Sequence, residues 1–183
     1  WTVTKVLIEG ILLVIVILFI FLGDVRSSLI VVTTLVITPL VTCMVMNQYG
    51  ISANLMSLGG LAIAIGLMVD STVVVVENVF HRLGHAGNTL EARLKTIVGA
   101  VSEVGTPVIF GISIIILVFL PLMTLEGMEG KTFSPLAYTI AIALAISLIV
   151  SLTLSPVLCA YILKGGADHD TRIIAILKSG YHR

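Results

Sequence analysis

Residues 66–78 read Gly-Leu-Met-Val-Asp-Ser-Thr-Val-Val-Val-Val-Glu-Asn, an apolar run interrupted by two carboxylic acids. The run is the centre of a longer apolar stretch from Leu55 to about residue 80. A hydrocarbon core about 30 Å thick needs about 20 such residues of helix, because lipid cannot pair free backbone groups. The stretch therefore predicts a transmembrane helix, and the rest of the chain is interpreted around it.

The two acids of this helix are the first candidate site. Placing Asp70 near the middle of a membrane span costs at least about 2.5–3.5 kcal/mol, so such a residue is a functional candidate by default. Glu77 follows seven residues later, which places both carboxylates on one helical face about 10 Å apart along the axis. Burial favours the neutral form of an acid unless a cation is near, so the pair suits proton transfer. The alternative is that both acids only bond neighbouring helices.

Composition extends the membrane interpretation to the whole chain. Of its 183 residues, 58% are hydrophobic and 11% are charged, against about 25% charged in a soluble domain. The apolar runs predict an all-α, polytopic transmembrane helix bundle with five spans, at about 6–22, 29–46, 55–80, 101–122 and 136–163. The zero net charge gives no basic surface for nucleic acid, and no glycine-rich phosphate loop for ATP is present.

The basic residues predict the direction of the spans. Ten lysines and arginines are present, and two of them, Lys5 and Lys131, lie on one side of the expected membrane. The other eight lie on the opposite side, which the positive-inside rule assigns to the cytoplasm. The chain is thus expected to enter from outside and to end inside.

The chain is expected to have two parts. Residues 1–163 form the helix bundle, and residues 164–183 form a cytoplasmic linker in which residues 171–178 suit an amphipathic surface helix as well as a plain linker. Because the chain starts at Trp1 and its first span is full length without a cleavage site, we interpret it as an excerpt from a longer polypeptide.

Small residues predict close helix contacts near the acids. The third expected span contains the pairs Gly60/Ala64 and Ala62/Gly66, at the spacing that lets helix backbones approach. The fifth contains a similar series, Ala137, Ala141 and Ala145. Tight packing alone would also explain these residues.

Several polar and sulfur residues have a structural interpretation. Cys43 and Cys159 are each alone in apolar runs, so we expect small packing residues. Asn78 is expected to join helices, and Glu9 and Glu103, near span ends, either to extend toward the membrane surface or to pair locally.

Two further polar groups offer possible cation ligands. His81 and His85 have a spacing that can bind zinc, but Gly84 and a cytoplasmic loop indicate a solvated surface. Glu126 and Glu129 flank Met128 in the turn before the fifth span, where they could attract cations or form an interfacial turn.

These motifs together resemble one family of transporters. The chain is similar to the resistance–nodulation–division (RND) efflux pumps over essentially its whole length, as helices two to six of a twelve-helix subunit. The residues that resemble the fourth helix of these pumps are 55–60, 64–66, 69–70 and 76–78, and those that resemble the heavy-metal branch are 124–130 and 133–137.

The resemblance implies a homotrimeric inner-membrane antiporter of Gram-negative bacteria. Such a pump works with a periplasmic adaptor and an outer-membrane channel, and exports metal cations in exchange for protons, without a bound cofactor. By motif position Asp70 would be the proton-relay aspartate and Glu77 the second essential acid, while the relay's lysine partner would lie in the part of the pump beyond this chain. Drug-exporting relatives carry a second Asp where this chain has Ser71.

The resemblance leaves the metal open. Zinc- and cobalt-type members carry Asp-Phe-Gly where this chain has Ala64-Ile65-Gly66, whereas copper- and silver-type members share Ala-Ile-Gly and use methionine pairs. Thioethers suit Cu(I) and Ag(I), which makes Met56 and Met68 candidate metal ligands on a transport path. Val75 and Leu144 stand where further methionines would be expected, so both methionines also fit a purely structural role.

Three functions are therefore weighed from the sequence. The first is proton-driven efflux of heavy-metal cations, the second is RND export of organic compounds, and the third is a non-transporting membrane scaffold or passive pore. Only the first two require Asp70 to titrate.

Overall fold

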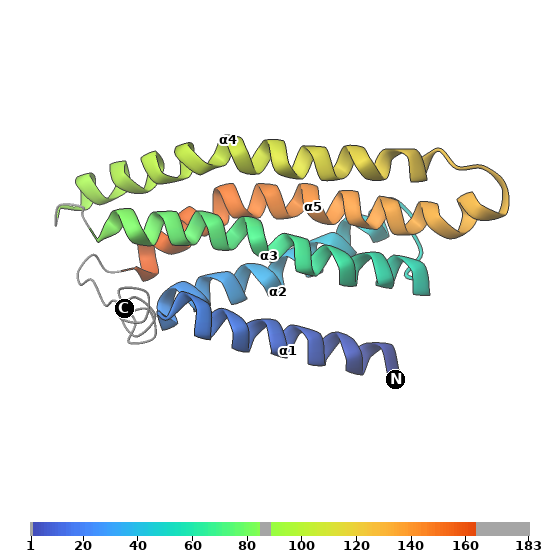
Figure 1. Cartoon of the computed structure of the whole chain (residues 1–183), viewed down its shortest axis with the longest axis horizontal. Helices are drawn as coiled ribbons and strands as arrows, with labels where there is room; N and C mark the ends of the chain where they lie inside the picture. The colour runs from blue at the N-terminus through green and yellow to red at the C-terminus, as the bar shows by residue number, and fades with distance from the viewer. Residues whose placement is uncertain (1, 85–88, 164–183) are drawn as a thin grey trace, which may run out of the picture.

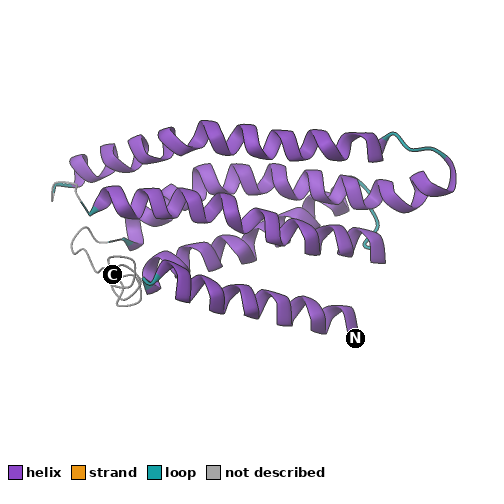
Figure 2. Cartoon of the chain, viewed as in Figure 1, coloured by secondary structure: helices purple, strands orange, loops and turns teal. Residues whose placement is uncertain are grey.

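The computed structural model describes residues 2–84 and 89–163, and every described element is a helix (Figures 1 and 2). The five helices are α1 (Thr2–Leu22), α2 (Val25–Gln48), α3 (Leu55–Leu83), α4 (Leu90–Met123) and α5 (Gly127–Ile162). The all-α prediction is confirmed. His85 and the expected surface helix at 171–178 lie outside the described residues.

The helices run back and forth along one axis, as the sequence predicted (Figure 1). Within the described residues, α2, α3, α4 and α5 are each long and apolar enough to cross a membrane. The first helix, α1, has 21 residues and is therefore about 30 Å long, but its role as a fifth span stays a prediction.

The helices extend beyond the spans expected from apolar residues. The second helix begins at Val25 because the Asp24 side chain accepts a hydrogen bond from the Ser27 backbone N–H at 3.1 Å. Likewise Thr89 caps α4, which begins at Leu90, about eleven residues before the start of the expected span at 101. Hydropathy marks the part of a helix that fits the hydrocarbon, whereas capping of the first free N–H groups decides where it starts.

The third helix is the centre of the bundle. It packs most extensively against α5 and also contacts α2 and α4, while α1 and α4 lie at opposite edges (Figure 1). Asn54 starts α3 with a capping box, because its side chain accepts from Ser57 N–H at 2.8 Å and its own N–H donates to Ser57 Oγ at 2.9 Å. The acid-bearing helix is therefore held on several sides by its neighbours.

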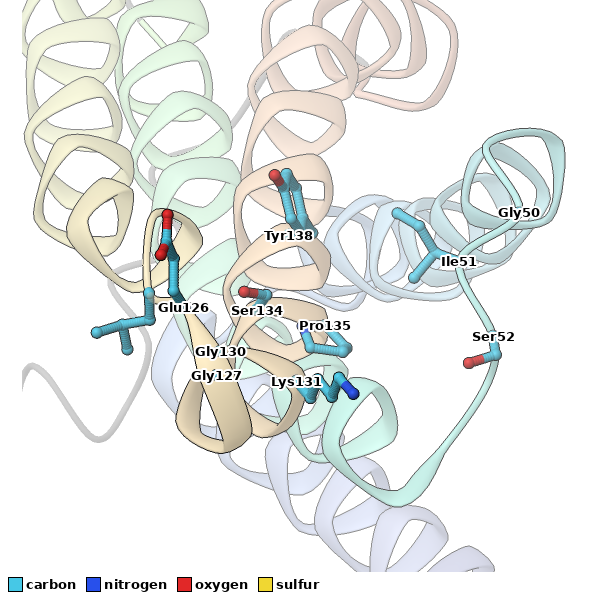
Figure 3. A pocket seen from close by; sticks show the side chains of 11 residues that line it. Gly50, Ile51, Ser52, Glu126, Gly127, Gly130, Lys131, Ser134, Pro135 and Tyr138 are labelled. Atoms are coloured by element: carbon cyan, nitrogen blue, oxygen red, sulfur yellow. The ribbon is translucent and has the colours of Figure 1, made fainter.

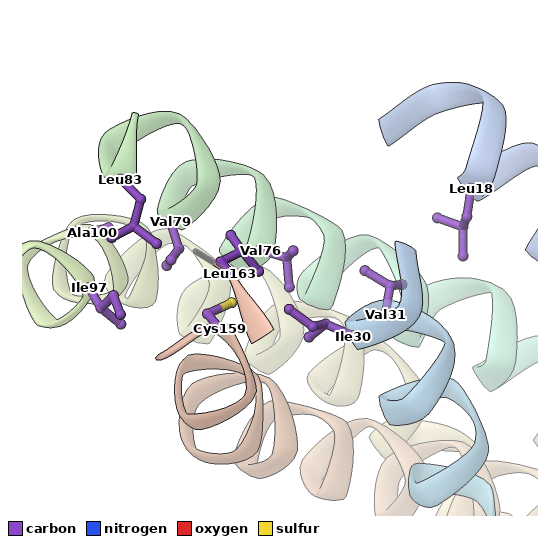
Figure 4. Packing of buried hydrophobic residues seen from close by; sticks show 10 residues of the cluster. All are labelled: Leu18, Ile30, Val31, Val76, Val79, Leu83, Ile97, Ala100, Cys159 and Leu163. Atoms are coloured by element: carbon purple, nitrogen blue, oxygen red, sulfur yellow. The ribbon is translucent and has the colours of Figure 1, made fainter. Parts of the chain in front are cut away.

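Two buried clusters hold the helices together. The first contains residues from all five helices and lies toward the end of the bundle where α5 ends (Figure 4). Its members are Leu18, Ile30, Val31, Val76, Val79, Leu83, Ile97, Ala100, Cys159 and Leu163. The second lies nearer the other end and includes Met68, Ile140 and Leu144. Cys159 packs as expected, whereas the expectation for Cys43 is wrong, because its side chain is exposed in the described bundle.

The small-residue prediction is right for one of its two pairs on α3, because Ala62 and Gly66 are exposed, and on α5 it is right for Ala137 but not for Ala145. Gly60 and Ala64 are buried against α5, but Ala145 of the expected series is exposed. The buried small residues of α5 follow a different four-residue series, Ala143, Ser147, Ser151, Ser155 and Cys159. The expected series counted alanines alone, whereas serine and cysteine are also small enough to line a close contact.

Candidate functional site

Asp70 and Glu77 lie on one face of α3, and both side chains are exposed in the five-helix unit. Gly66, Val74 and His81 are exposed on the same face, at three- and four-residue intervals. The common face follows from the seven-residue spacing of the acids, which is nearly two turns. The structure therefore brings the two predicted acids to one surface but does not bury them among the described helices.

The opposite face of α3 forms the packed core. Ala64, Val75 and Val79 are fully buried there, and Met68 is 3% exposed. Because a carboxylate cannot face lipid at low cost, the acid-bearing face has to meet water or polar protein groups at that depth. The packing thus separates a dry side of α3 from the side that carries both acids.

A polar network next to Glu77 anchors α3 to α4. The Asn78 side-chain amide donates to the Ala100 carbonyl at 2.8 Å and to Glu103 Oε2 at 3.2 Å, and Arg82 forms an ion pair with the same carboxylate. These contacts confirm the expectations that Asn78 joins helices and that Glu103 pairs locally. Glu77 therefore occupies a turn of α3 whose position relative to α4 is fixed by hydrogen bonds.

Buried hydroxyl groups join α3 to α5 on the dry side, next in sequence to Asp70. Ser71 Oγ and Ser147 Oγ lie 3.3 Å apart, and Ser147 also donates to the Met68 carbonyl at 3.5 Å. Our reading of the sequence missed this contact. The signal for it was the four-residue serine series of α5, which lies on the face that carries Ala143.

The two candidate metal ligands are not brought together. Met68 is buried in the cluster that contains Leu144, whereas Met56 is 37% exposed. Their separation of twelve residues corresponds to about 18 Å along the helix. In the described ranges no group of three or more His, Cys, Asp or Glu side chains could hold a metal ion.

A pocket of about 570 Å³ opens at the expected outer end of the bundle, between the α2–α3 loop and the start of α5. Gly130 is required there, because a Cβ at this position would run into the Leu125 carbonyl. Glu126 lines the pocket but Glu129 does not, and Met128 is 85% exposed. Figure 3 shows the Glu126 carboxylate and the Lys131 ammonium directed to different sides, so they do not converge on one ligand.

Sequence comparisons match the whole chain to one protein family. The family model described as the AcrB/AcrD/AcrF family matches residues 1–183. Protein HelA of Legionella pneumophila is 44% identical over 98% of this chain. The cobalt-zinc-cadmium resistance protein CzcA of Cupriavidus metallidurans is 42% identical over 98%, and the cation efflux system protein CusA of Escherichia coli K12 is 39% identical over 87%.

A structural comparison agrees with these matches. The crystal structure of a heavy metal efflux pump superposes with a TM-score of 0.73 at 37% sequence identity, over 88% of this chain and 15% of that one. The chain spans 18%, 17% and 16% of HelA, CzcA and CusA, respectively. It therefore corresponds to less than a fifth of the proteins it resembles.

Proposed function

The chain belongs to the AcrB/AcrD/AcrF family, and from this premise we propose that it is part of a proton-driven exporter of heavy-metal cations. The similarity to CzcA, to CusA and to a heavy metal efflux pump of known structure confirms the resemblance to the heavy-metal branch of the RND pumps. Export of metal cations by the parent protein and the coupling of that export to protons are both parts of the proposal.

The observation that carries the proposal is the pair of carboxylates on one uncovered face of α3. Asp70 and Glu77 are exposed side chains in the middle and toward the cytoplasmic end of a helix that is apolar enough to cross a membrane. A scaffold would have no use for two acids at this depth, each of which costs free energy to insert. Proton coupling gives them a role, since a carboxyl that alternates between neutral and charged forms changes its preferred environment with each proton.

In the proposed mechanism Asp70 takes up a proton from the outer side and releases it toward the cytoplasm past Glu77. Moving one charge through the membrane field is worth about 2.3 kcal/mol per 100 mV, which is the energy available per proton for export. The rest of the parent pump covers the acid-bearing face and supplies the cationic partner of Asp70. The same proposal places the parent in the bacterial inner membrane as a homotrimer, with a periplasmic adaptor and an outer-membrane channel.

Export of organic compounds is the second candidate, and one observation favours keeping it. The described residues offer no three-residue metal group, and Met68 packs in a cluster with Leu144, which is not a metal ligand. Selectivity for the cargo would then be determined in parts of the parent outside this chain. Both candidates share the proton chemistry of Asp70.

The experiment uses the full-length parent in a metal-sensitive bacterial host, with residues numbered as here. Growth is scored on copper, silver, zinc, cobalt and nickel salts and on a panel of organic toxins. Wild type, Asp70→Asn and the control Glu91→Gln are compared at matched membrane levels. The control removes an exposed acid in the first turn of α4 by the same carboxylate-to-amide change.

We expect wild type and the control to protect against at least one metal and Asp70→Asn to lose that protection almost completely, because an amide does not titrate. Protection against organic toxins alone would replace metal export by the second candidate. If Asp70→Asn protects as well as wild type, the proton mechanism is wrong and the scaffold or passive pore takes its place.

A further inference from the structure

A small cavity lies between α2 and α3, on a face of α3 that does not carry Asp70. Its volume of about 10 Å³ is that of a site for one water molecule. Its lining consists of Val31, Thr34, Leu35 and Thr38 from α2 and Met68, Val69 and Thr72 from α3. Both helices contribute to it, so any occupant would touch both.

Three of the seven residues that line the cavity are threonines buried in the bundle. Thr34, Thr38 and Thr72 are 2%, 2% and 4% exposed. Thr34 donates its hydroxyl proton to the Val31 carbonyl at 2.8 Å, which leaves its oxygen free to accept. The hydroxyls of Thr38 and Thr72 make no hydrogen bond to any residue that the structure describes. A buried hydroxyl without a partner is costly, and helix interiors ordinarily avoid it.

A proline frees a backbone carbonyl in one of the residues that line the cavity. Pro39 lies inside α2 and has no backbone N–H, so the Leu35 carbonyl four residues earlier lacks its usual helical donor. Leu35 is one of the cavity-lining residues. The break in the hydrogen-bond ladder of α2 therefore coincides with the cavity.

We infer that this cavity binds one water molecule that bridges α2 to α3. The four groups match the bonding capacity of water: the Thr38 and Thr72 hydroxyls donate to it, and the Thr34 hydroxyl oxygen and the Leu35 carbonyl accept from it. A hard cation is a poorer match, because it requires about six oxygen ligands. Without the water, the hydroxyls of Thr38 and Thr72 have no hydrogen-bond partner among the described residues.

The bound water makes the contact between α2 and the acid-bearing helix depend on hydration at membrane depth. It supplies the partner that Pro39 removes and holds α2 to α3 without a direct side-chain bond. The inference concerns packing within this chain, so it holds whichever cargo the parent exports and whether or not Asp70 carries protons.

The sign of a stability change separates a hydrated cavity from a dry one. Thr38→Val and Thr72→Val, made in the full-length parent, replace a hydroxyl with a methyl group of similar size. In a dry cavity the change removes an unpaired polar group and raises the apparent melting temperature, whereas with a bound water it removes a partner of that water and lowers it. Thr38→Ser is the companion variant, since it keeps the hydroxyl. Thr42→Val is the control, because Thr42 already donates to the Thr38 carbonyl within α2 at 2.8 Å.

We expect Thr38→Val and Thr72→Val each to lower the melting temperature by about 2 °C or more, and Thr38→Ser to lower it less. In the double valine variant the decrease should be smaller than the sum of the two single decreases, because both changes remove partners of the same water. An unchanged or raised melting temperature in both valine variants would overturn the inference. A structure of the parent at a resolution that shows ordered water gives a second test independent of folding yield. Density bonded to Thr38 and Thr72 is expected, and a clearly empty cavity would also overturn it.

Discussion

A Cβ atom placed on Gly60 of α3 would lie 2.8 Å from the carbonyl oxygen of Leu136 in α5. No real side chain fits at that distance, so the two backbones are in direct contact there. Thr139 contributes its own side chain to the same contact, 3.3 Å from the added atom. The spacing of the acid-bearing helix from α5 is therefore set by the absence of a side chain at one residue.

Gly60→Ala should destabilise the parent by about 1–3 kcal/mol, since a methyl group can be placed only by pushing the two helices apart. Gly59→Ala is the matched control, because an added Cβ at that neighbouring position meets nothing within 4 Å in the described residues. Alanine is also the better helix former. Thermal unfolding of the purified parent measures both. Equal melting temperatures for the two variants would show that the close contact does not constrain the helices.

The architecture was largely predictable, because long apolar runs separated by polar turns allow few solutions in a membrane. Helix ends were not, since the starts at Val25 and Leu90 depend on capping by Asp24 and Thr89 rather than on hydropathy. The close contact at Gly60 could be expected from its spacing to Ala64. Its partner on α5, Leu136, could not, because the series of small residues on α5 indicates a buried face but does not indicate which residue meets Gly60.

Asn78→Asp should weaken the α3–α4 anchor more than Asn78→Ala does. Removing the amide loses a hydrogen bond to the Ala100 carbonyl, which is worth about 1 kcal/mol. Aspartate loses the same bond and also places a negative charge beside Glu103. The ion pair between Glu103 and Arg82 is half exposed on both sides, so breaking it alone should change stability little.

Melting temperatures of Asn78→Ala, Asn78→Asp and Arg82→Gln in the full-length parent test this order. The combined variant Asn78→Asp with Glu103→Gln should recover part of the loss, because it removes the repulsion. If Asn78→Asp is no worse than Asn78→Ala and the second change has no effect, Glu103 does not interact with this position.

Glu77→Gln should reduce proton-coupled transport while leaving the amount of folded protein unchanged. The side chain is exposed in the described bundle, so an amide of equal size removes only the titrating group. The adjacent anchor formed by Asn78 is retained. Transport measured in proteoliposomes with an imposed pH gradient should fall tenfold or more, against little change for Glu91→Gln, an exposed acid in the first turn of α4. If Glu77→Gln transports at the wild-type rate, Glu77 does not carry protons, and Asp70 is the proton carrier of this pair of acids.

The acids of the candidate site were the easiest part to find, because a charged residue inside an apolar run is conspicuous. Their surroundings were not predictable, since neither the exposure of Asp70 in this unit nor the Ser71–Ser147 contact follows from residues that are neighbours in sequence. The roles of the two methionines could not be separated from the sequence. Met56 and Met68 look alike in the sequence, and only packing distinguishes the exposed one from the buried one.

That packing makes the role of Met68 testable by exchange with its neighbour. Met68 and Leu144 belong to one buried cluster and are 3% and 0% exposed, so Met68→Leu and Leu144→Met are volume-conserving changes that should each cost less than about 1.5 kcal/mol. If Met68 is a packing residue, Met68→Leu leaves resistance to every metal unchanged in the growth assay. A specific loss of copper and silver resistance would instead identify it as a thioether ligand on the transport path, since these soft monovalent ions are the ones that thioethers bind. In that case Leu144→Met supplies a second thioether, and Leu144→Ile is its control. A gain of copper and silver resistance in Leu144→Met alone would show that the absence of a thioether at this position limits metal transport.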